Sequence, residues 1–343
     1  MISAACSSVH YYSDPYSSKG EDAGFSVSLS PEDVAGLTDN EISTALKSAF
    51  AVIQQDLIEQ NASGTPIVSG ATAIVALVVG KKTFIANAGD SIAMVFRHGG
   101  EIEVPFRHSV DDHRKEVIGK AFTTADGKHV KFDYDSEGYF TLYEFTDQGV
   151  KRLAGIEPTK GLGDLSFASL LPDWSTPDVT VIEETTRVVL ASDGIDKAQS
   201  TQASDPYANS QELIIDYSSL SSDELRKTFG RLPIWIEQVP KYIANYARLH
   251  KTWDDVLVMA TDPAPDAVKL FGVFDGHGGK HVAQYAATHM ENAICQQLAL
   301  QQEKKRQKQA FVAAYDERSA AMHLYAAHAK AKAAARRAAE VTP

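Results

Sequence analysis

Residues 270–279 read Leu270-Phe-Gly-Val-Phe-Asp275-Gly-His-Gly-Gly279, which is the most informative segment of the chain. Its first half is apolar and has the length of a buried strand. An aspartate, a histidine and three glycines follow directly, so the strand ends in a turn that carries a carboxylate. Glycines allow a tight bend and let backbone carbonyls come close to a cation. The stretch therefore predicts a strand end at which Asp275 binds a metal ion.

Short apolar segments elsewhere in the chain predict further strands, because they are apolar throughout or alternate between apolar and polar residues. The expected strands are residues 25–29, 69–79, 82–87, 92–96, 130–134, 139–143, 179–182, 187–190 and 256–260. Helical spacing occurs at residues 40–57, at 209–250 in two pieces and at 281–300, with Asp39 or Asn40 as the first N-cap. Many strands between helical ends predict sheets packed between helices, an α+β fold.

Length, charge and cysteine content limit the class of protein. The 343 residues are 44% hydrophobic and no linker-like segment divides them, which predicts one large core after a flexible, polar lead-in at residues 1–20. The net charge of −12 argues against binding to nucleic acids or anionic membranes. Only two cysteines, no signal-peptide pattern in residues 1–10 and no apolar run of membrane-spanning length predict a protein of the cytoplasm or nucleus.

Four aspartates, Asp90, Asp193, Asp254 and Asp275, each stand at an end of a predicted strand. Taken singly, such an aspartate is an ordinary turn former. Carboxylates that cluster repel one another and raise each other's pKa unless cations neutralise them. Oxygen ligands of this kind select Mg²⁺ or Mn²⁺, and the Cys and His spacing of a zinc site is absent from the sequence. The pattern therefore predicts a divalent-cation centre built from carboxylates.

Seven blocks of the chain resemble motifs of the metal-dependent protein phosphatases of the protein phosphatase 2C class. Besides Asp275-Gly-His-Gly-Gly279, they are Ser69-Gly-Ala-Thr-Ala73, Asn87-Ala-Gly-Asp-Ser91, His108-Ser-Val-Asp-Asp-His113, Gly161-Leu-Gly-Asp164, Leu190-Ala-Ser-Asp-Gly194 and Trp253-Asp-Asp-Val-Leu-Val258. The resemblance implies a catalytic domain at residues 21–300 and a helical Ala/Lys/Arg-rich extension at 301–343. It also implies an antiparallel β-sandwich flanked by helices on both faces, in four layers (α-β-β-α).

The resemblance also implies a role for each site residue. Two Mg²⁺ or Mn²⁺ ions are expected, with Asp275 bridging them and the Gly276 carbonyl completing the second site. The remaining implied ligands are Asp193 and Asp254 at the first ion, the N-terminal acidic pair Glu21 and Asp22, and Asp90 with Asp196 for a loosely bound third ion. A water between the ions attacks phosphorus in line without a phosphoenzyme, and His277 protonates the departing oxygen. The alternative role for His277 is only to hydrogen-bond its own turn.

The order of the motifs departs from that of the family. There the Asp-Gly-His-Gly-Gly strand lies near the N-terminus, whereas here it follows the Trp253 block, so the chain resembles a rearranged (permuted) member. Asp254 and Asp255 stand directly before the Leu270 strand. This leaves a second assignment open, in which Asp254 plays the first acidic pair and Asp22 plays the family's last aspartate.

Three positions differ from the family's usual residues. Ser17 stands where the family has a phosphate-binding arginine, and Lys19 is the nearby candidate for binding substrate, without the bidentate fork of an arginine. Ile92 follows Asp90-Ser91 where an arginine is common. Asp196 is displaced by one position from the family's acidic residue, which weakens the third-ion site.

Three functions follow as alternatives. The first is a Mg²⁺- or Mn²⁺-dependent phosphatase acting on phosphoserine and phosphothreonine in proteins, as a monomer. The second is a pseudophosphatase, a binding or scaffold module that keeps the fold without turnover, and the third is a hydrolase of small phosphate esters. The basic groups at residues 304–306 and 336–337 fit either a docking helix or a solvated helical face.

Overall fold

The computed structural model describes residues 7–13, 21–98, 101–108, 118–124, 127–136, 139–171, 173–192, 258–261 and 267–340. The chain forms two compact units, Met1–Leu298 and Ala299–Pro343. All of the described strands lie in the first unit, together with the helix α1 (Asp39–Ala62) and the start of the helix α8 (His281–Glu340).

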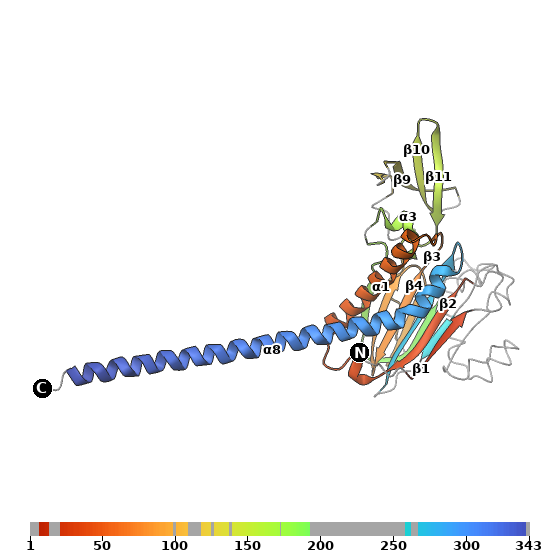
Figure 1. The fold of residues 1–343 in the computed structure, drawn as a ribbon. Helices are drawn as coiled ribbons and strands as arrows, with labels where there is room; N and C mark the ends of the chain where they lie inside the picture. The colour runs from red at the N-terminus through yellow and green to blue at the C-terminus, as the bar shows by residue number, and fades with distance from the viewer. Residues whose placement is uncertain are drawn as a thin grey trace. The chain divides into compact units, whose positions relative to one another are not determined.

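The main sheet has six strands in the order β1-β2-β16-β4-β5-β13, and all neighbours are antiparallel. The strands are β1 (Ser7–Ser13), β2 (Ala23–Leu29), β16 (Val268–Phe274), β4 (Ala73–Val79), β5 (Lys82–Ala88) and β13 (Asp178–Ile182). Val268 of β16 pairs with Leu29 on one side and with Val79 on the other. The strand that leads into Asp275 comes late in the sequence, yet it lies inside the sheet (Figure 1).

A second antiparallel sheet packs on one face of the main sheet. Its strands, in the order β15-β14-β6-β7, are β15 (Val258–Thr261), β14 (Thr185–Ala191), β6 (Ile92–Arg97) and β7 (Ile102–Glu103). Successive side chains of a strand point to opposite faces. Ile74 and Ala76 of β4 therefore join the core between the two sheets, while Val75 and Leu77 join the core under the helices. Burial on both faces explains why residues 73–79 are apolar throughout.

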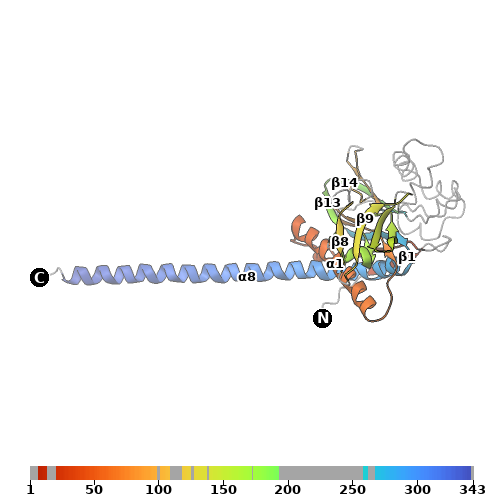
Figure 2. The same ribbon diagram turned by 90° about the horizontal axis from the view of Figure 1, so that it is seen from above.

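Helices cover the other face of the main sheet. The apolar positions predicted to line one side of α1 are all buried: Ile42, Leu46, Phe50, Ile53 and Leu57. They share a core with Val282, Met290 and Leu298 of α8, and the two helices lie next to each other in both views (Figures 1 and 2).

The predicted N-cap of α1 was wrong by one or two residues. The N-cap is Thr38, whose side chain accepts a hydrogen bond from the Glu41 backbone N–H, while the Glu41 carboxylate accepts from the Thr38 N–H. This reciprocal capping box satisfies two backbone donors. It explains why Thr38 caps the helix rather than Asp39 or Asn40.

Two smaller sheets complete the first unit. One consists of β12 (Leu162–Gly163), β3 (Gly70–Ala71) and β17 (Gly276–His277), and the other of β11 (Gly149–Ile156), β10 (Phe140–Thr146), β9 (His129–Tyr134) and β8 (Ala121–Thr123). The four-stranded sheet has its own apolar cluster, in which the rings of Phe132 and Phe140 stack on each other and lie tilted against Phe167 of the short helix α3 (Leu165–Ala168). Phe167 in turn stacks on Trp174. A 3₁₀ turn, η1 (Pro31–Asp33), follows β2.

The predicted α+β class with antiparallel sheets is confirmed. The helices predicted at residues 209–250 lie outside the described residues, so the described helical layer is the one formed by α1 and α8. None of the described helices is both long enough and apolar enough to cross a membrane.

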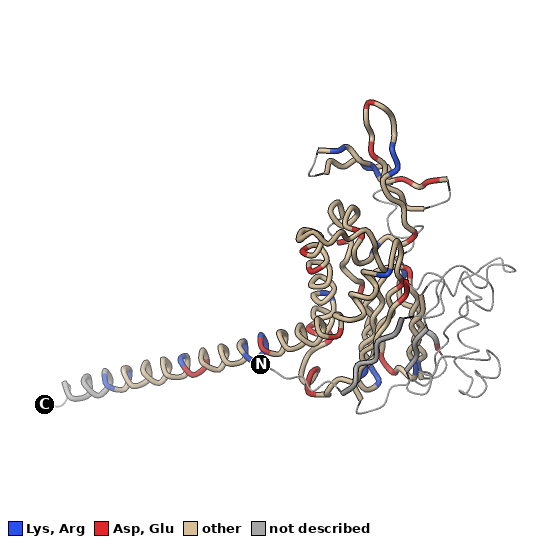
Figure 3. Tube along the Cα trace, turned by 45° about the vertical axis from the view of Figure 1, so that its right-hand side comes forward, with Lys and Arg blue, Asp and Glu red and all other residues tan. Residues whose placement is uncertain are grey.

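The second unit, as far as it is described, is the continuation of α8 to Glu340. Acidic and basic positions both occur along it (Figure 3). Phe311, Tyr315 and Tyr325 are more than half exposed there.

Candidate functional site

The strand β16 delivers Asp275 to the start of β2. Phe274 pairs with Ala23, so the antiparallel register leads Asp275 toward Asp22, which is completely buried. The Thr72 backbone N–H donates a hydrogen bond of 2.9 Å to the Asp275 carbonyl, which ties the strand end to the entry of β4. The N-terminal acidic pair and the late motif therefore meet through the pairing of β2 with β16.

The glycine turn after Asp275 packs against Glu21. A Cβ at Gly276 would collide with the Glu21 backbone carbonyl, so this position requires glycine. The Glu21 carboxylate accepts a hydrogen bond of 2.9 Å from the Gly279 backbone N–H. These contacts join two segments that are 258 residues apart in the chain.

His277 is paired with a carboxylate from a third segment. In the three-stranded sheet, Gly70 lies between Gly163 on one side and His277 on the other. Asp164 follows Gly163, and its two carboxylate oxygens lie 3.0 and 2.9 Å from His277 Nε2. A side chain at Gly70 would overlap the Asp164 carboxylate, so the bare backbone of Gly70 leaves room for the pair.

The backbone of Asp164 is held in an unusual conformation. Its φ of 43° and ψ of 51° lie in the left-handed region, which costs free energy for a residue with a Cβ. The preceding Gly163 is fixed by Gln54 of α1, whose side chain accepts from the Gly163 N–H at 2.8 Å and donates to its carbonyl at 3.1 Å. The helix α1 thus supports the position of Asp164 indirectly.

The charged groups around His277 shift the pKa of its imidazole. Burial of the imidazole is the largest influence and by itself would lower the pKa of His277. The charge and hydrogen bond of Asp164, assisted by the charges of Asp90 and Glu21, act in the opposite direction and outweigh it. The pKa of His277 is therefore raised above its ordinary value of 6.5, which favours the charged imidazolium near neutral pH.

The turn that carries Asp90 is fixed from two sides. Thr72 Oγ1 and Ser91 Oγ form a buried hydrogen bond of 2.6 Å. Arg107 Nε donates to the Asp90 carbonyl at 2.6 Å, and His108 Nδ1 accepts from the Gly89 N–H at 3.1 Å. The same Thr72 thus contacts both the Asp275 strand end and the Asp90 turn, so these two carboxylates are positioned together.

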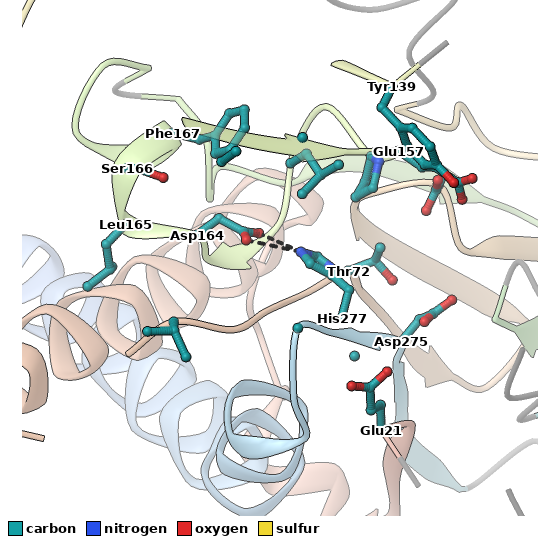
Figure 4. Close-up of a pocket in the computed structure, with 18 of the residues that line it drawn as sticks. Glu21, Thr72, Tyr139, Glu157, Asp164, Leu165, Ser166, Phe167, Asp275 and His277 are labelled. Carbon is teal, nitrogen blue, oxygen red and sulfur yellow. Dashed lines mark hydrogen bonds and ion pairs between the residues drawn. The ribbon is translucent and has the colours of Figure 1, made fainter. Parts of the chain in front are cut away.

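A cavity of about 650 Å³ collects these side chains. Its acidic lining residues are Glu21, Asp22, Asp90, Glu157, Asp164 and Asp275. Figure 4 shows the His277–Asp164 pair in the middle of the view, with Asp275 and Glu21 below it and Tyr139 and Glu157 above. His277 is the basic side chain among the described residues that line the cavity, and no Lys or Arg joins it there.

The structure brings together six of the residues proposed from the sequence: Glu21, Asp22, Asp90, Asp275, Gly276 and His277 all line this cavity. Asp193, Asp196, Asp254 and Lys19 lie outside the described residues. Sequence reasoning gave Asp164 no role, although its Gly161-Leu-Gly-Asp164 turn was a visible signal. The contact of Asp164 with His277 depends on strand pairing that no local pattern shows.

The donor chemistry of the cavity fits a hard divalent cation. Carboxylate oxygens and the Gly276 carbonyl are the ligands that Mg²⁺ and Mn²⁺ prefer. A carboxylate as deeply buried as that of Asp22 is costly without a nearby positive charge or donor. Among the described residues, no group of three or more His, Cys, Asp and Glu side chains is arranged to hold an ion by itself.

Comparison with curated proteins finds similarity to probable protein phosphatases 2C from plants. Probable protein phosphatase 2C 58 of Arabidopsis thaliana is 29% identical over 199 residues, which cover 54% of this chain and 61% of that protein. Probable protein phosphatase 2C 57 of Oryza sativa subsp. japonica is 31% identical over 158 residues, covering 45% of this chain and 39% of that protein. The chain thus spans less than two thirds of the length of these curated relatives.

Among solved structures, the serine-threonine phosphatase 2C from Toxoplasma gondii matches with a TM-score of 0.42 and 14% identity, over 80% of this chain and 96% of that one. The family model of Protein phosphatase 2C matches residues 28–117 and 247–338, together more than half of the chain. The second matched range contains the Asp275 motif. The chain therefore belongs to the protein phosphatase 2C family.

Proposed function

We propose that this protein is a Mg²⁺- or Mn²⁺-dependent phosphatase that hydrolyses phosphoserine and phosphothreonine in proteins. The observation that carries the proposal is that Asp275, Asp22, Glu21 and Asp90 line the same cavity as His277, whose imidazole is held by Asp164. Membership of the protein phosphatase 2C family supports the same reaction class. The region proposed as catalytic domain is residues 21–300, with residues 301–343 as a separate helical extension.

The proposed metal ligands are the Asp275 carboxylate, the Gly276 carbonyl and the acidic pair Glu21 and Asp22, with Asp193 and Asp254 from outside the described residues. Asp90 is the proposed ligand of a third ion. When bound, divalent cations lower the pKa of coordinated water and offset the charge of phosphoryl oxygens. The protein's own contribution is to hold the carboxylates in place through the pairing of β2 with β16 and through the Thr72 contacts.

His277 is the proposed general acid. Departure of a serine or threonine alkoxide requires a proton, and a donor with a pKa near the working pH supplies it efficiently. Asp164 orients the imidazole through Nε2 and favours its charged form, so the proton on Nδ1 is the one that the scheme assigns to the departing oxygen. Asp164 acts as a positioning residue in this scheme.

A specific observation keeps the pseudophosphatase as the second candidate. Among the described residues, the cavity lining contains no Lys or Arg that would bind phosphate, and Lys19 lies outside them. A phosphate group would then depend on bound cations for its affinity. A module of this kind would recognise phosphorylated partners and release them unchanged.

The deciding experiment measures hydrolysis of p-nitrophenyl phosphate and of a phosphothreonine peptide with Mn²⁺, with Mg²⁺ and with EDTA. We expect turnover that requires a cation and that falls by about two orders of magnitude or more in Asp275→Asn. The matched control is Asp316→Asn, which changes an exposed aspartate of α8.

The other outcomes separate the candidates. Absence of turnover while calorimetry still detects cation binding would replace the enzyme by the pseudophosphatase. Turnover of p-nitrophenyl phosphate without any turnover of phosphopeptides would favour the hydrolase of small esters. Wild-type turnover in Asp275→Asn would remove Asp275 from the site.

A further inference from the structure

Two apolar residues that line the cavity are open to solvent. Val68, in the segment between α1 and β3, lines the cavity although it is 84% exposed, and Leu153 of β11 lines it while 37% exposed. Single exposed apolar residues are common on protein surfaces, but apolar side chains gathered at a pocket are a feature of binding sites. Two such side chains, from different elements but lining the same cavity, therefore need an explanation.

The backbone of β11 is irregular at this point. Leu142 of β10 pairs with Ala154, whereas the next residue, Tyr143, pairs with Arg152, so Leu153 is the extra residue of a β-bulge. Bulges turn a side chain away from its regular direction and occur often beside functional sites. The bulge accounts for how Leu153, on a largely exposed strand, contributes to the cavity.

The size and charge of the cavity limit what would bind beside these two residues. A volume of about 650 Å³ is within the range of pockets that hold a drug-sized ligand, so a phosphoryl group leaves room for neighbouring side chains. Glu157 lies on the same side as Tyr139, across the His277–Asp164 pair from Glu21 (Figure 4). An acidic residue beside the phosphorylated one would be repelled there, whereas an apolar residue would bury surface against Val68 and Leu153.

We propose that Val68 and Leu153 form an apolar rim that binds a hydrophobic side chain next to the phosphorylated residue of the substrate. The inference rests on the proposed function and narrows its substrate class to phosphoproteins with an apolar flank. Burial of one aliphatic side chain against the rim favours such a sequence over a serine-flanked one by about tenfold. Acidic flanks are disfavoured relative to both.

Binding and turnover are tested separately. Three peptides with leucine, serine or glutamate on both sides of the phosphothreonine are prepared, each also with a phosphonate analogue that cannot be hydrolysed. Dissociation constants of the analogues are measured by fluorescence anisotropy in Mn²⁺ buffer, and kcat/KM is measured with the hydrolysable peptides. The expected order of affinity is leucine, then serine, then glutamate.

The variants are Val68→Ser and Leu153→Ser, alone and combined, with Val150→Ser as the matched control. Val150 is a 61% exposed residue of the same strand that does not line the cavity. The double variant is expected to reduce the leucine-to-serine affinity ratio from about ten to about one, while Val150→Ser keeps the ratio of the wild type. Circular dichroism and the melting temperature confirm that each variant is folded.

The outcomes distinguish this inference from the proposed function. If neither p-nitrophenyl phosphate nor any of the three peptides is hydrolysed but the analogues bind in the expected order, the phosphatase is refuted and the apolar rim stands. If the enzyme turns over all three peptides equally and the analogues bind with equal affinity, the rim is refuted and the phosphatase stands. A leucine preference that survives in the double variant, or is equally reduced by Val150→Ser, also overturns the rim.

Discussion

Asp164 and His277 are 113 residues apart in the chain and meet over Gly70, which pairs with Gly163 on one side and with His277 on the other. Three local features make the pair possible: the absence of a side chain at Gly70, the left-handed backbone of Asp164 and the hydrogen bonds between Gln54 and Gly163. Strained residues of this kind persist where the surrounding structure over-determines them. The strain at Asp164 is consistent with its proposed role of orienting His277.

Replacing His277 with alanine tests the proton donor. We expect His277→Ala to slow hydrolysis of a phosphothreonine peptide by about 100-fold or more, because the alkoxide leaves unprotonated. The loss on p-nitrophenyl phosphate is expected to be much smaller, since nitrophenolate is a good leaving group. His129→Ala, at an exposed position of β9, serves as the control. Equal losses on both substrates would contradict the general-acid role.

The pH profile tests Asp164. Because Asp164 raises the pKa of His277, and because the acid must be protonated to act, peptide hydrolysis falls as the pH rises through that pKa. Asp164→Asn removes the charge, so the alkaline limb of kcat is expected to move to lower pH. Asp147→Asn, an exposed change in the β10–β11 turn, is expected to keep the wild-type profile. An unchanged alkaline limb in Asp164→Asn would mean that Asp164 does not tune His277.

Among single residues, the sequence identified Asp275, His277 and the Glu21–Asp22 pair as site residues, and the structure places them in one cavity. Each stands next to a strand or a glycine turn that is visible in the local pattern. The role of Asp164 was missed because it depends on which turns face each other across Gly70. Exposed Leu153 was missed because the bulge that directs it has no sequence signal of its own.

Among the secondary-structure elements, α1 shows how a helix with one buried apolar face helps to hold the candidate site in place. Its five predicted apolar positions are buried against the main sheet, and its Gln54 fixes the Gly163 backbone. The buried face of α1 was predicted correctly because the spacing of its apolar residues repeats over several turns. The sequence missed β11, whose residues 149–153 are exposed and carry little of the alternating pattern of a half-buried strand.

Replacing one buried phenylalanine of α1 measures how much the packing of this helix contributes to the stability of the protein. Phe50→Ala is expected to lower the free energy of unfolding by about 3–5 kcal/mol, because Phe50 is fully buried and the cavity left behind collapses only in part. Ile58→Ala on the same helix, where the side chain is 42% exposed, is expected to cost about 0.5 kcal/mol. Urea denaturation monitored by circular dichroism measures both. Similar costs for the two variants would show that α1 does not pack on the sheet as described.

In the whole molecule, the decisive feature is the position of β16 between β2 and β4. The sequence showed that residues 270–274 form a buried strand, and it showed that the motif order is rearranged. It could not show that the strand lies inside the main sheet, since pairing partners are set by contacts far apart in the chain. The two assignments of Asp22 and Asp254 stayed open for the same reason.

Truncation of the chain tests whether folding of the main sheet depends on β16. A chain that ends at Thr261 lacks β16 and the whole of α8, so β2 and β4 lose their common neighbour. We expect neither cooperative unfolding nor phosphatase activity from it. A chain that ends at Lys305 keeps every member of the main core and is expected to melt within a few degrees of the full chain. Cooperative melting of the shorter chain would contradict the central role of β16.

The late position of β16 also has a consequence for biosynthesis. On the ribosome, β2 and β4 emerge long before their shared partner, and each has an unsatisfied hydrogen-bonding edge until that partner arrives. Such edges attract other strands, so we expect nascent chains stalled before residue 268 to be protease-sensitive and to bind chaperones, and protease resistance of those chains would contradict this. The carboxylates proposed as metal ligands and His277 come together only in this late step, so we expect a prematurely terminated product to lack the whole proposed site rather than part of it.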